Sequence, residues 1–273
     1  MNKPLILFFI LLLGGFLIFG GAGWGLPALL HPDERTIVEP AMRMVQNRTF
    51  EPDVFYRPDH LLIQINALIY RVIVFFKGLP AESIGDISVH VFYLTGRIIT
   101  GLFAFGSIIV AYLIGRKYSN AIGLISAFLF AVFPLFVTHS KFASPDVPIT
   151  FFMLLFIYFA LAYMQKPTLK LLTIMALVTA AFITVKYPGA ILLVMVAVSV
   201  IVVSLVDKKF LRILKHGVAT ILFTVVFEFL ISPALMFRFN DVRAAIINEA
   251  REEHLGADGL GMGGNILFYL NTL

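Results

Sequence analysis

Residues 188–206 read PGAILLVMVAVSVIVVSLV and contain no charged side chain. A helix needs about 20 apolar residues to cross the hydrocarbon core of a bilayer, and this stretch supplies nearly that length. Comparable apolar runs lie at 4–23, 94–114, 120–138, 147–165, 169–185 and 213–231, and another begins near residue 265. The pattern predicts an all-α, polytopic membrane helical bundle of about eight membrane helices.

The composition supports a membrane protein. The 273 residues are 60% hydrophobic and 14% charged, whereas soluble domains are about 45–50% apolar and about 25% charged. A water-soluble core of this size cannot absorb so much apolar surface, so lipid must solvate much of the chain. Cysteine is absent, which excludes disulfide scaffolds, cysteine nucleophiles and thiolate metal sites.

The topology depends on the run 61–77, LLIQINALIYRVIVFFK, which contains Gln64, Asn66 and Arg71. If this run does not cross and Lys3 lies inside, the short inner loops collect eight basic residues and one acid: Arg116, Lys117, Lys166, Lys170, Lys208, Lys209, Arg212 and Lys215, with Asp207. A crossing would reverse this bias. Inner loops are enriched in Lys and Arg, so the charge pattern favours an interfacial or re-entrant segment.

This topology places two polar segments on the outer face. They are the loop 24–93, with interfacial helices inside it, and the loop 232–264. Fourteen of the sixteen acids then fall outside, since only Asp207 and Glu228 do not. The run 4–23 exceeds the usual 7–15 residues of a cleaved signal core, which favours a retained membrane anchor. The groups available for chemistry are therefore concentrated on one face.

The first candidate site is His31-Pro32-Asp33-Glu34, just beyond the first apolar run. Carboxylates beside an apolar boundary are costly to desolvate, and such groups tend to have a role. Asp33 there could take a proton from an acceptor hydroxyl as a general base. The same residues also fit the start of a short surface helix over 34–46, with Asp33 as its N-cap and Thr36 to Glu39 in capping-box spacing.

A second candidate is YRPDH at 56–60, which leads into the run 61–77. Pro58 stiffens the approach and Asp59 could cap the following helix. Arg57 and His60 would lie near the membrane surface, within reach of an anionic head group. Ordinary interfacial anchoring by Tyr and Arg is the alternative.

Two further candidates lie at tight outer connections. Asp146 closes the stretch SKFASPD and begins a predicted membrane helix, where it could face the first acid across an outer cavity or stabilise the helix dipole. Lys186 opens the turn KYPG and could pair with a phosphate as a point charge. A snorkelling turn residue is the alternative for Lys186.

The last polar groups are less specific. Glu249, Glu253 and His254 could hold a metal, but their spacing fits the face of a solvated amphipathic helix better. The glycines from Gly256 to Gly264 match no phosphate loop. Glu228 lies within a predicted membrane helix and needs a partner or a wet cavity.

Taken in order, these features resemble a known family. The Asp-Glu pair after the first helix, Arg97 early in the next crossing helix, the Ser-Pro-Asp before a later helix, and the Lys-Tyr-Pro-Gly turn are similar to the dolichyl-phosphate-mannose protein mannosyltransferase and aminoarabinose transferase superfamily. The tail from Ser232-Pro233 to Tyr269 also resembles an outer segment of bacterial and archaeal members. These are GT-C fold glycosyltransferases, and the resemblance covers essentially the whole chain.

The resemblance implies a single GT-C-like transmembrane domain over 1–273, the N-terminal part of a longer protein. It implies an inverting transfer of sugar from a polyprenyl-phosphate carrier, with Asp33 as catalytic base. The substrate-binding residues would be Glu34, Arg57, His60, Arg97, Asp146, Lys186, Tyr187 and His254. Lys186 would face the lipid phosphate, and Arg57 stands where the family has a Lys-Pro-Pro-like approach.

The implied partners are the lipid-linked sugar donor, a lipid, glycan or protein acceptor, and the bilayer. We expect a multi-pass protein of the cell membrane with its active site on the extracytoplasmic face. No cofactor is expected, although the sequence leaves a divalent metal open. Nucleic acid is not expected, because the basic residues lie in short loops rather than in a stripe. A transporter or flippase-like protein for lipid-linked sugars and a non-catalytic membrane subunit are the rival interpretations.

Overall fold

The computed structural model describes residues 3–28 and 31–249, and over these residues it is all-helical, without a strand. The long helices are α1 (Lys3–Phe19), α4 (Val89–Arg116), α5 (Asn120–Val132), α7 (Asp146–Gln165), α8 (Leu169–Val185), α9 (Ile191–Val206) and α10 (Leu211–Ile231). The remaining elements are α2 (Pro32–Gln46), α3 (His60–Phe76), η1 (Ala81–Asp86), α6 (Pro134–His139), η2 (Tyr187–Ala190), α11 (Pro233–Phe237) and α12 (Phe239–Glu249). The predicted all-α fold is confirmed.

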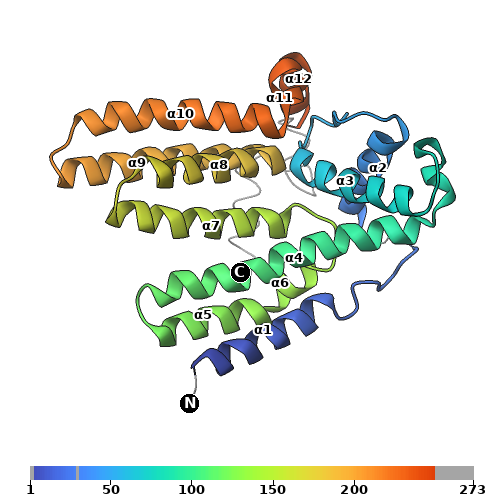
Figure 1. Ribbon diagram of the computed structural model, residues 1–273, viewed down its shortest axis with the longest axis horizontal. Coiled ribbons are helices and arrows are strands. Elements are labelled where there is room, and N and C mark those ends of the chain that lie inside the picture. The colour runs from blue at the N-terminus through green and yellow to red at the C-terminus, as the bar shows by residue number, and fades with distance from the viewer. Residues whose placement is uncertain (1–2, 29–30, 250–273) are drawn as a thin grey trace, which may run out of the picture.

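The long helices run side by side as a bundle, with α4, α7 and α8 in its middle (Figure 1). Over the described residues, four stretches are long and apolar enough to cross a membrane: α4, α7, Tyr187–Val206 and α10. The apolar helices α1, α3, α5 and α8 are shorter. The predicted polytopic bundle is therefore confirmed, whereas the last predicted crossing, near residue 265, lies outside the described residues.

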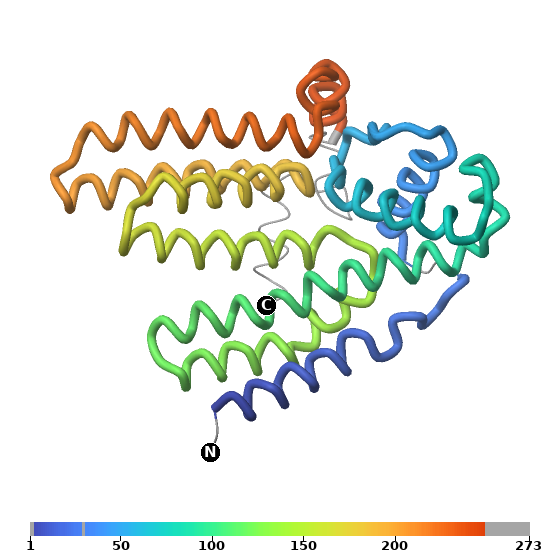
Figure 2. Tube along the Cα trace, in the orientation of Figure 1, coloured from blue at the N-terminus to red at the C-terminus, as the bar shows by residue number. Residues whose placement is uncertain are grey.

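One predicted span is divided in two. The sequence predicts a single crossing over 120–138. In the structure α5 ends at Val132, and a separate short helix, α6, begins at Pro134. Phe133 adopts an extended conformation, with φ −64° and ψ 114°. A residue before proline is disfavoured in the α-conformation because it clashes with the proline ring. The break redirects the chain toward the start of α7 (Figure 2).

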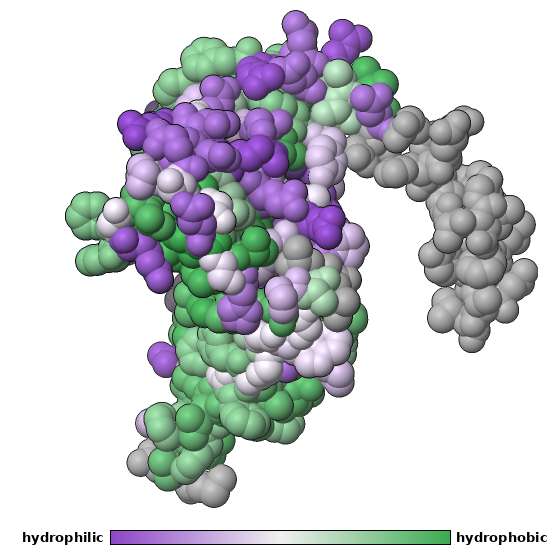
Figure 3. Space-filling view, turned by 90° about the vertical axis from the view of Figure 1, so that its right-hand side faces the viewer, coloured by the Kyte–Doolittle hydropathy of each residue, from purple (hydrophilic) through white to green (hydrophobic). Residues whose placement is uncertain are grey.

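Five elements gather at one end of the bundle: α2, α3, η1, α11 and α12 (Figure 1). We call them the head region. The helix α4 reaches into it because its 28 residues span about 42 Å at 1.5 Å per residue. In Figure 3 the hydrophilic side chains gather over the upper part of this end, above a mostly hydrophobic body.

The run 61–77, whose course the sequence leaves open, forms α3 and lies in the head region beside α2. Its polar side chains are used locally. Asn66 Nδ2 donates to Leu62 O at 2.8 Å, and the Tyr70 hydroxyl donates to Phe92 O at 2.9 Å. Arg71 donates to Thr49 O just beyond α2 and covers the Phe50 ring at 4.0 Å. The Arg71 contacts hold α3 to the segment just after α2, and the Tyr70 hydrogen bond holds it to the first turn of α4.

Candidate active site

The neighbouring acids Asp33 and Glu34 lie in the first turn of α2, behind Pro32 at its first position. Asp33 is not the N-cap that the helix-start interpretation predicts, since His31 takes that place and makes no side-chain cap. Thr36 Oγ1 donates to Asp33 O at 2.7 Å instead of closing a capping box. Successive helical residues point about 100° apart, so Glu34 is buried while Asp33 stays partly exposed.

Glu34 is used in a buried ion pair with Arg97 of α4. Nε and Nη2 of Arg97 donate to the two carboxylate oxygens of Glu34, each at 2.8 Å. Nη1 of Arg97 donates to Ala22 O at 2.8 Å and to Trp24 O at 2.7 Å. Glu34 also accepts from the backbone N–H of Ala143 at 3.0 Å. This pair and its backbone partners connect four segments: the helices α2 and α4, the loop that follows α1, and the loop that precedes α7.

Asp33 faces Arg57 on the other side of α2. Arg57 Nη1 lies 3.3 Å from Asp33 Oδ1, and Arg57 Nε donates to Asp59 Oδ2 at 2.9 Å. Arg57 Nη2 also donates to Thr36 Oγ1 at 2.6 Å. The guanidinium therefore holds Asp33 in place from the loop that precedes α3.

Asp59 lies beneath this contact and is fully buried. Its backbone N–H donates to Val185 O at 3.2 Å, at the end of α8, and its φ of 44° is left-handed. Burial raises the pKa of Asp59 to about 7, while the charges of Arg57 and Lys186 oppose the rise. Its Oδ1 has no hydrogen-bond partner among the described residues.

Lys186 and Asp146 form a further ion pair, near the contact of Asp33 with Arg57. Lys186 Nζ lies 3.5 Å from Asp146 Oδ1, and His139 Nδ1 lies 3.8 Å from Asp146 Oδ2. These side chains come from the end of α8, the start of α7 and the end of α6. All three are about one third exposed, so they remain accessible from the head region.

The Arg57–Asp33 pair and the Lys186–Asp146 pair are electrostatically connected. Lys186 and Asp33 both act on the charge of Asp59, so five charged residues belong to one group: Asp33, Arg57, Asp59, Lys186 and Asp146. We call these five residues, together with His139, the charged cluster. Among the described residues, no group of three or more His, Asp or Glu side chains has the arrangement of a metal site.

The side chains of His60 and Tyr187 are engaged within the protein, whereas the sequence had suggested that they contact a substrate. His60 is fully buried, and burial lowers the pKa of its imidazole to about 4. Its Nε2 lies 2.6 Å from Val54 O and must donate, so Nδ1 accepts from the Ser232 hydroxyl at 2.5 Å. The Tyr187 hydroxyl donates to Phe55 O at 2.6 Å. His60 is therefore a neutral link rather than a surface cation.

Two members of the charged cluster, Asp59 and His139, and the adjoining Thr36 were not among the site residues predicted from the sequence. Asp59 was predicted as a helix cap, and neither His139 nor Thr36 was predicted to take part in the site. The sequence did carry one indication that Asp59 belongs to the site. Arg57 and Asp59 stand on either side of Pro58, and a turn at proline can bring the side chains of residues i and i+2 together. His254, a predicted site residue, lies outside the described residues, as do Glu253 and the glycines that follow.

The sequence matches the family model described as dolichyl-phosphate-mannose-protein mannosyltransferase over residues 47–242, well over half of the chain. The matched range includes Arg57, Asp59, Asp146 and Lys186, and it begins after Asp33. No curated protein matches the chain.

Proposed function

The chain belongs to the dolichyl-phosphate-mannose-protein mannosyltransferase family, and on that premise we propose that it transfers a sugar from a polyprenyl-phosphate carrier to an acceptor hydroxyl. Family membership, together with several helices of membrane-spanning length, makes it a multi-pass membrane glycosyltransferase. The proposal adds the donor class, an inverting reaction, Asp33 as base, and a site on the extracytoplasmic face of the cell membrane.

The convergence of the charged cluster carries this proposal. Its members come from the first turn of α2, the loop before α3, the end of α6, the first turn of α7 and the end of α8. Charged groups near a membrane are costly to assemble and tend to mark a functional site. A cluster with two acids and two cations within reach of solvent offers both a base and a phosphate-binding surface.

In the proposed reaction the acceptor oxygen attacks the anomeric carbon from the side opposite the carrier. The bond between that carbon and the phosphate oxygen breaks, and polyprenyl phosphate leaves with the electron pair. Asp33 takes the proton of the acceptor hydroxyl. A single displacement of this kind inverts the configuration of the anomeric carbon. Asp33 suits the role because its side chain is 36% exposed on a helix that the buried Glu34–Arg97 pair holds firmly.

Lys186 and Arg57 are the proposed partners of the leaving phosphate. Cations placed where negative charge develops stabilise a transition state, and they act more strongly away from bulk water. Arg57 contacts Asp33 at 3.3 Å, so it would connect the base with the leaving group. Lys186, whose side chain is about one third exposed, has one loose contact, at 3.5 Å to Asp146. It can turn toward a phosphate without losing a short hydrogen bond.

Four residues of the expected substrate site fit a positioning role better. Glu34 and Arg97 satisfy each other in the core, and His60 and Tyr187 bond to backbone and to Ser232. Among the described residues, none of their buried side-chain polar atoms lacks a hydrogen-bond partner. We therefore assign substrate contact to Arg57, Asp146 and Lys186, and orientation of the head region to the other four.

The sharpest test is Asp33→Asn, assayed in membranes supplied with a panel of polyprenyl-phosphate sugars. Loss of a general base should lower the transfer rate by about 10²–10⁴, with donor binding retained. Asp53→Asn is the matched control, because Asp53 is an exposed acid of the same region that pairs with Arg43. Near-wild-type transfer by Asp33→Asn would refute the assignment of the base. A transporter would keep moving its lipid-linked substrate after this substitution.

A further inference from the structure

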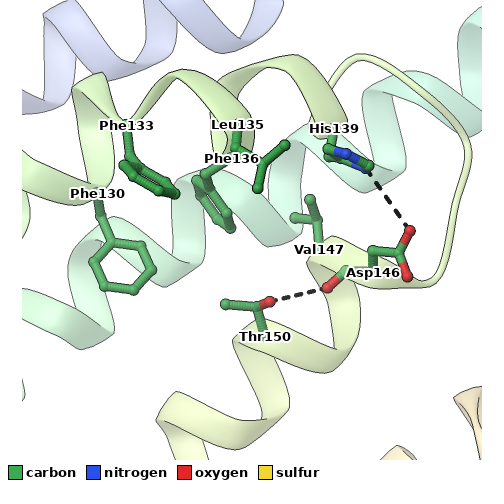
Figure 4. A pocket seen from close by; sticks show the side chains of 8 residues that line it. All are labelled: Phe130, Phe133, Leu135, Phe136, His139, Asp146, Val147 and Thr150. Atoms are coloured by element: carbon green, nitrogen blue, oxygen red, sulfur yellow. Dashed lines mark hydrogen bonds and ion pairs between the residues drawn. The ribbon is translucent and has the colours of Figure 1, made fainter. Parts of the chain in front are cut away.

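A second feature adjoins the charged cluster: an apolar groove of ≈ 380 Å³ between α5, α6 and α7. Its lining residues are Phe130, Phe133, Leu135, Phe136, Val147 and Thr150, together with His139 and Asp146. In Figure 4 three phenylalanine rings lie along one side, and His139 and Asp146 lie at the end away from Phe130. We call it the α6 groove.

The polar end of the groove has unused hydrogen-bonding capacity. The two carboxylate oxygens of Asp146 contact Lys186 at 3.5 Å and His139 at 3.8 Å, both longer than a good hydrogen bond of 2.7–3.2 Å. The Thr150 hydroxyl donates to the backbone oxygen of Asp146 at 2.9 Å and leaves the carboxylate free. His139 Nδ1 makes no hydrogen bond to any described residue.

Asp146 belongs to the groove and to the charged cluster at once. A molecule with a hydrocarbon chain in the groove would therefore place its head beside Lys186 and the cluster. The chemistry of the groove end selects among such molecules. A phosphate there would meet the Asp146 carboxylate, and like charges in contact are costly. An uncharged head with hydroxyl groups can donate to Asp146 and also bond to His139.

We propose that the α6 groove binds the hydrocarbon chain of a lipid acceptor, and that Asp146 and His139 bind hydroxyl groups of its uncharged head. This inference rests on the proposed function, and it names the acceptor class as a neutral glycolipid. The donor phosphate would occupy the other side of Lys186, toward Arg57. Both substrates would then meet at the charged cluster from different sides of Asp146.

The test uses the full chain in phosphatidylcholine nanodiscs with a diazirine-bearing glucosyl diacylglycerol, whose cross-links are mapped by mass spectrometry. We expect labels within residues 130–150, reduced several-fold by unlabelled glucosyl diacylglycerol and unchanged by farnesyl phosphate. Leu135→Trp should fill the groove and lower labelling several-fold. Leu129→Trp is the control, since Leu129 is similarly exposed, at 58% against 62% for Leu135, and does not line the groove.

Three results would overturn the inference. Displacement of the probe by farnesyl phosphate would place the donor chain in the groove, and labelling that excess glycolipid does not reduce would show general bilayer contact. Equal labelling of both tryptophan variants would show that the probe does not bind in the α6 groove. Labelling needs no donor, so it should persist in Asp33→Asn. Failure of transfer is thereby distinguished from failure of lipid binding.

Discussion

Asp33 and Glu34 are adjacent in sequence and have opposite environments. Glu34 is buried against Arg97, and Asp33 is 36% exposed beside Arg57. The helical rotation between consecutive residues separates the two side chains, so Glu34 can stabilise the fold while Asp33 stays available for its proposed role as base. At the scale of single residues, the site depends on this division.

The buried pair gives a stability prediction. Arg97→Gln should lower the free energy of unfolding by about 3–5 kcal/mol, because it leaves the Glu34 carboxylate buried without its counter-ion. Thermal unfolding in detergent would measure the change. Arg43→Gln is the control, because Arg43 forms an exposed pair with Asp53, and exposed pairs contribute about 0–1 kcal/mol. Equal losses for the two variants would contradict the structural role of Arg97.

The burial of Asp59 predicts a dependence on pH. Its pKa rises on folding from 3.8 to about 7, so the folded state holds the proton more tightly. The associated stability is fully present below about pH 3.8 and is lost as pH rises through about 7. Asp59→Asn should therefore reduce the loss of stability between pH 5 and pH 8, by up to a few kcal/mol since each pKa unit is worth about 1.4.

Unfolding midpoints at the two pH values would check this for the wild type and Asp59→Asn. Asparagine tolerates the left-handed backbone of position 59, so the substitution should not strain the turn. His60, whose pKa burial lowers to about 4, acts in the opposite sense but equally in both proteins. Identical pH profiles would show that Asp59 is not protonated in the folded protein near neutral pH.

At the scale of elements, α4 and α5 approach each other closely beside the short turn that joins them. A Cβ added at Gly115 of α4 would lie 2.8 Å from Gly123 Cα and 2.9 Å from Gly123 N on α5. Backbone atoms cannot move aside as a flexible side chain can. The two helices approach closely at this point because both positions lack a side chain, a common device in membrane bundles.

We predict that Gly115→Ala lowers stability by about 1–3 kcal/mol, the usual cost of overpacking. Gly217→Ala on α10 is the matched control, because a Cβ there would meet nothing within 4 Å. Alanine is also a better helix former than glycine by about 1 kcal/mol, so the control should be neutral or stabilising. Comparable destabilisation by both would argue against this close approach of α4 and α5.

At the scale of the whole molecule, the basic residues of the short loops gather at the end of the bundle away from the head region. The connections after α4, α7 and α9 lie opposite the head region (Figure 1), and they carry most of the short-loop Lys and Arg residues. Helix order alone places these loops together. The positive-inside bias therefore predicts that the head region and its charged cluster lie outside the cytoplasm.

Cysteine labelling can test this orientation directly, because the chain contains no cysteine. Glu82→Cys in η1 should react with an impermeant maleimide in intact cells. Lys209→Cys, between α9 and α10, should react at least tenfold less until the cells are permeabilised, because the membrane shields it. Both positions are exposed. The reverse pattern would place the head region in the cytoplasm and refute the proposed location of the site.

The sequence by itself determined the helices. Apolar runs and prolines are local properties. Accordingly α8 matches its predicted range 169–185, and the other membrane helices among the described residues agree within a few residues, apart from the break before Pro134. The order of polar motifs between the apolar runs also identified Asp33, Arg57, Asp146 and Lys186 as candidates.

Only the tertiary structure decided which polar groups meet and which are buried. The pairing of Glu34 with Arg97 and the contact of the buried His60 with Ser232 join segments far apart in the chain. The burial of Asp59 and the place of His139 beside Asp146 also depend on how the helices pack. Burial sets whether an acid or imidazole carries charge, because desolvation disfavours the ionised form. Hydropathy along the chain records local preference for lipid or water, but it holds no information about which side chains the bundle brings together.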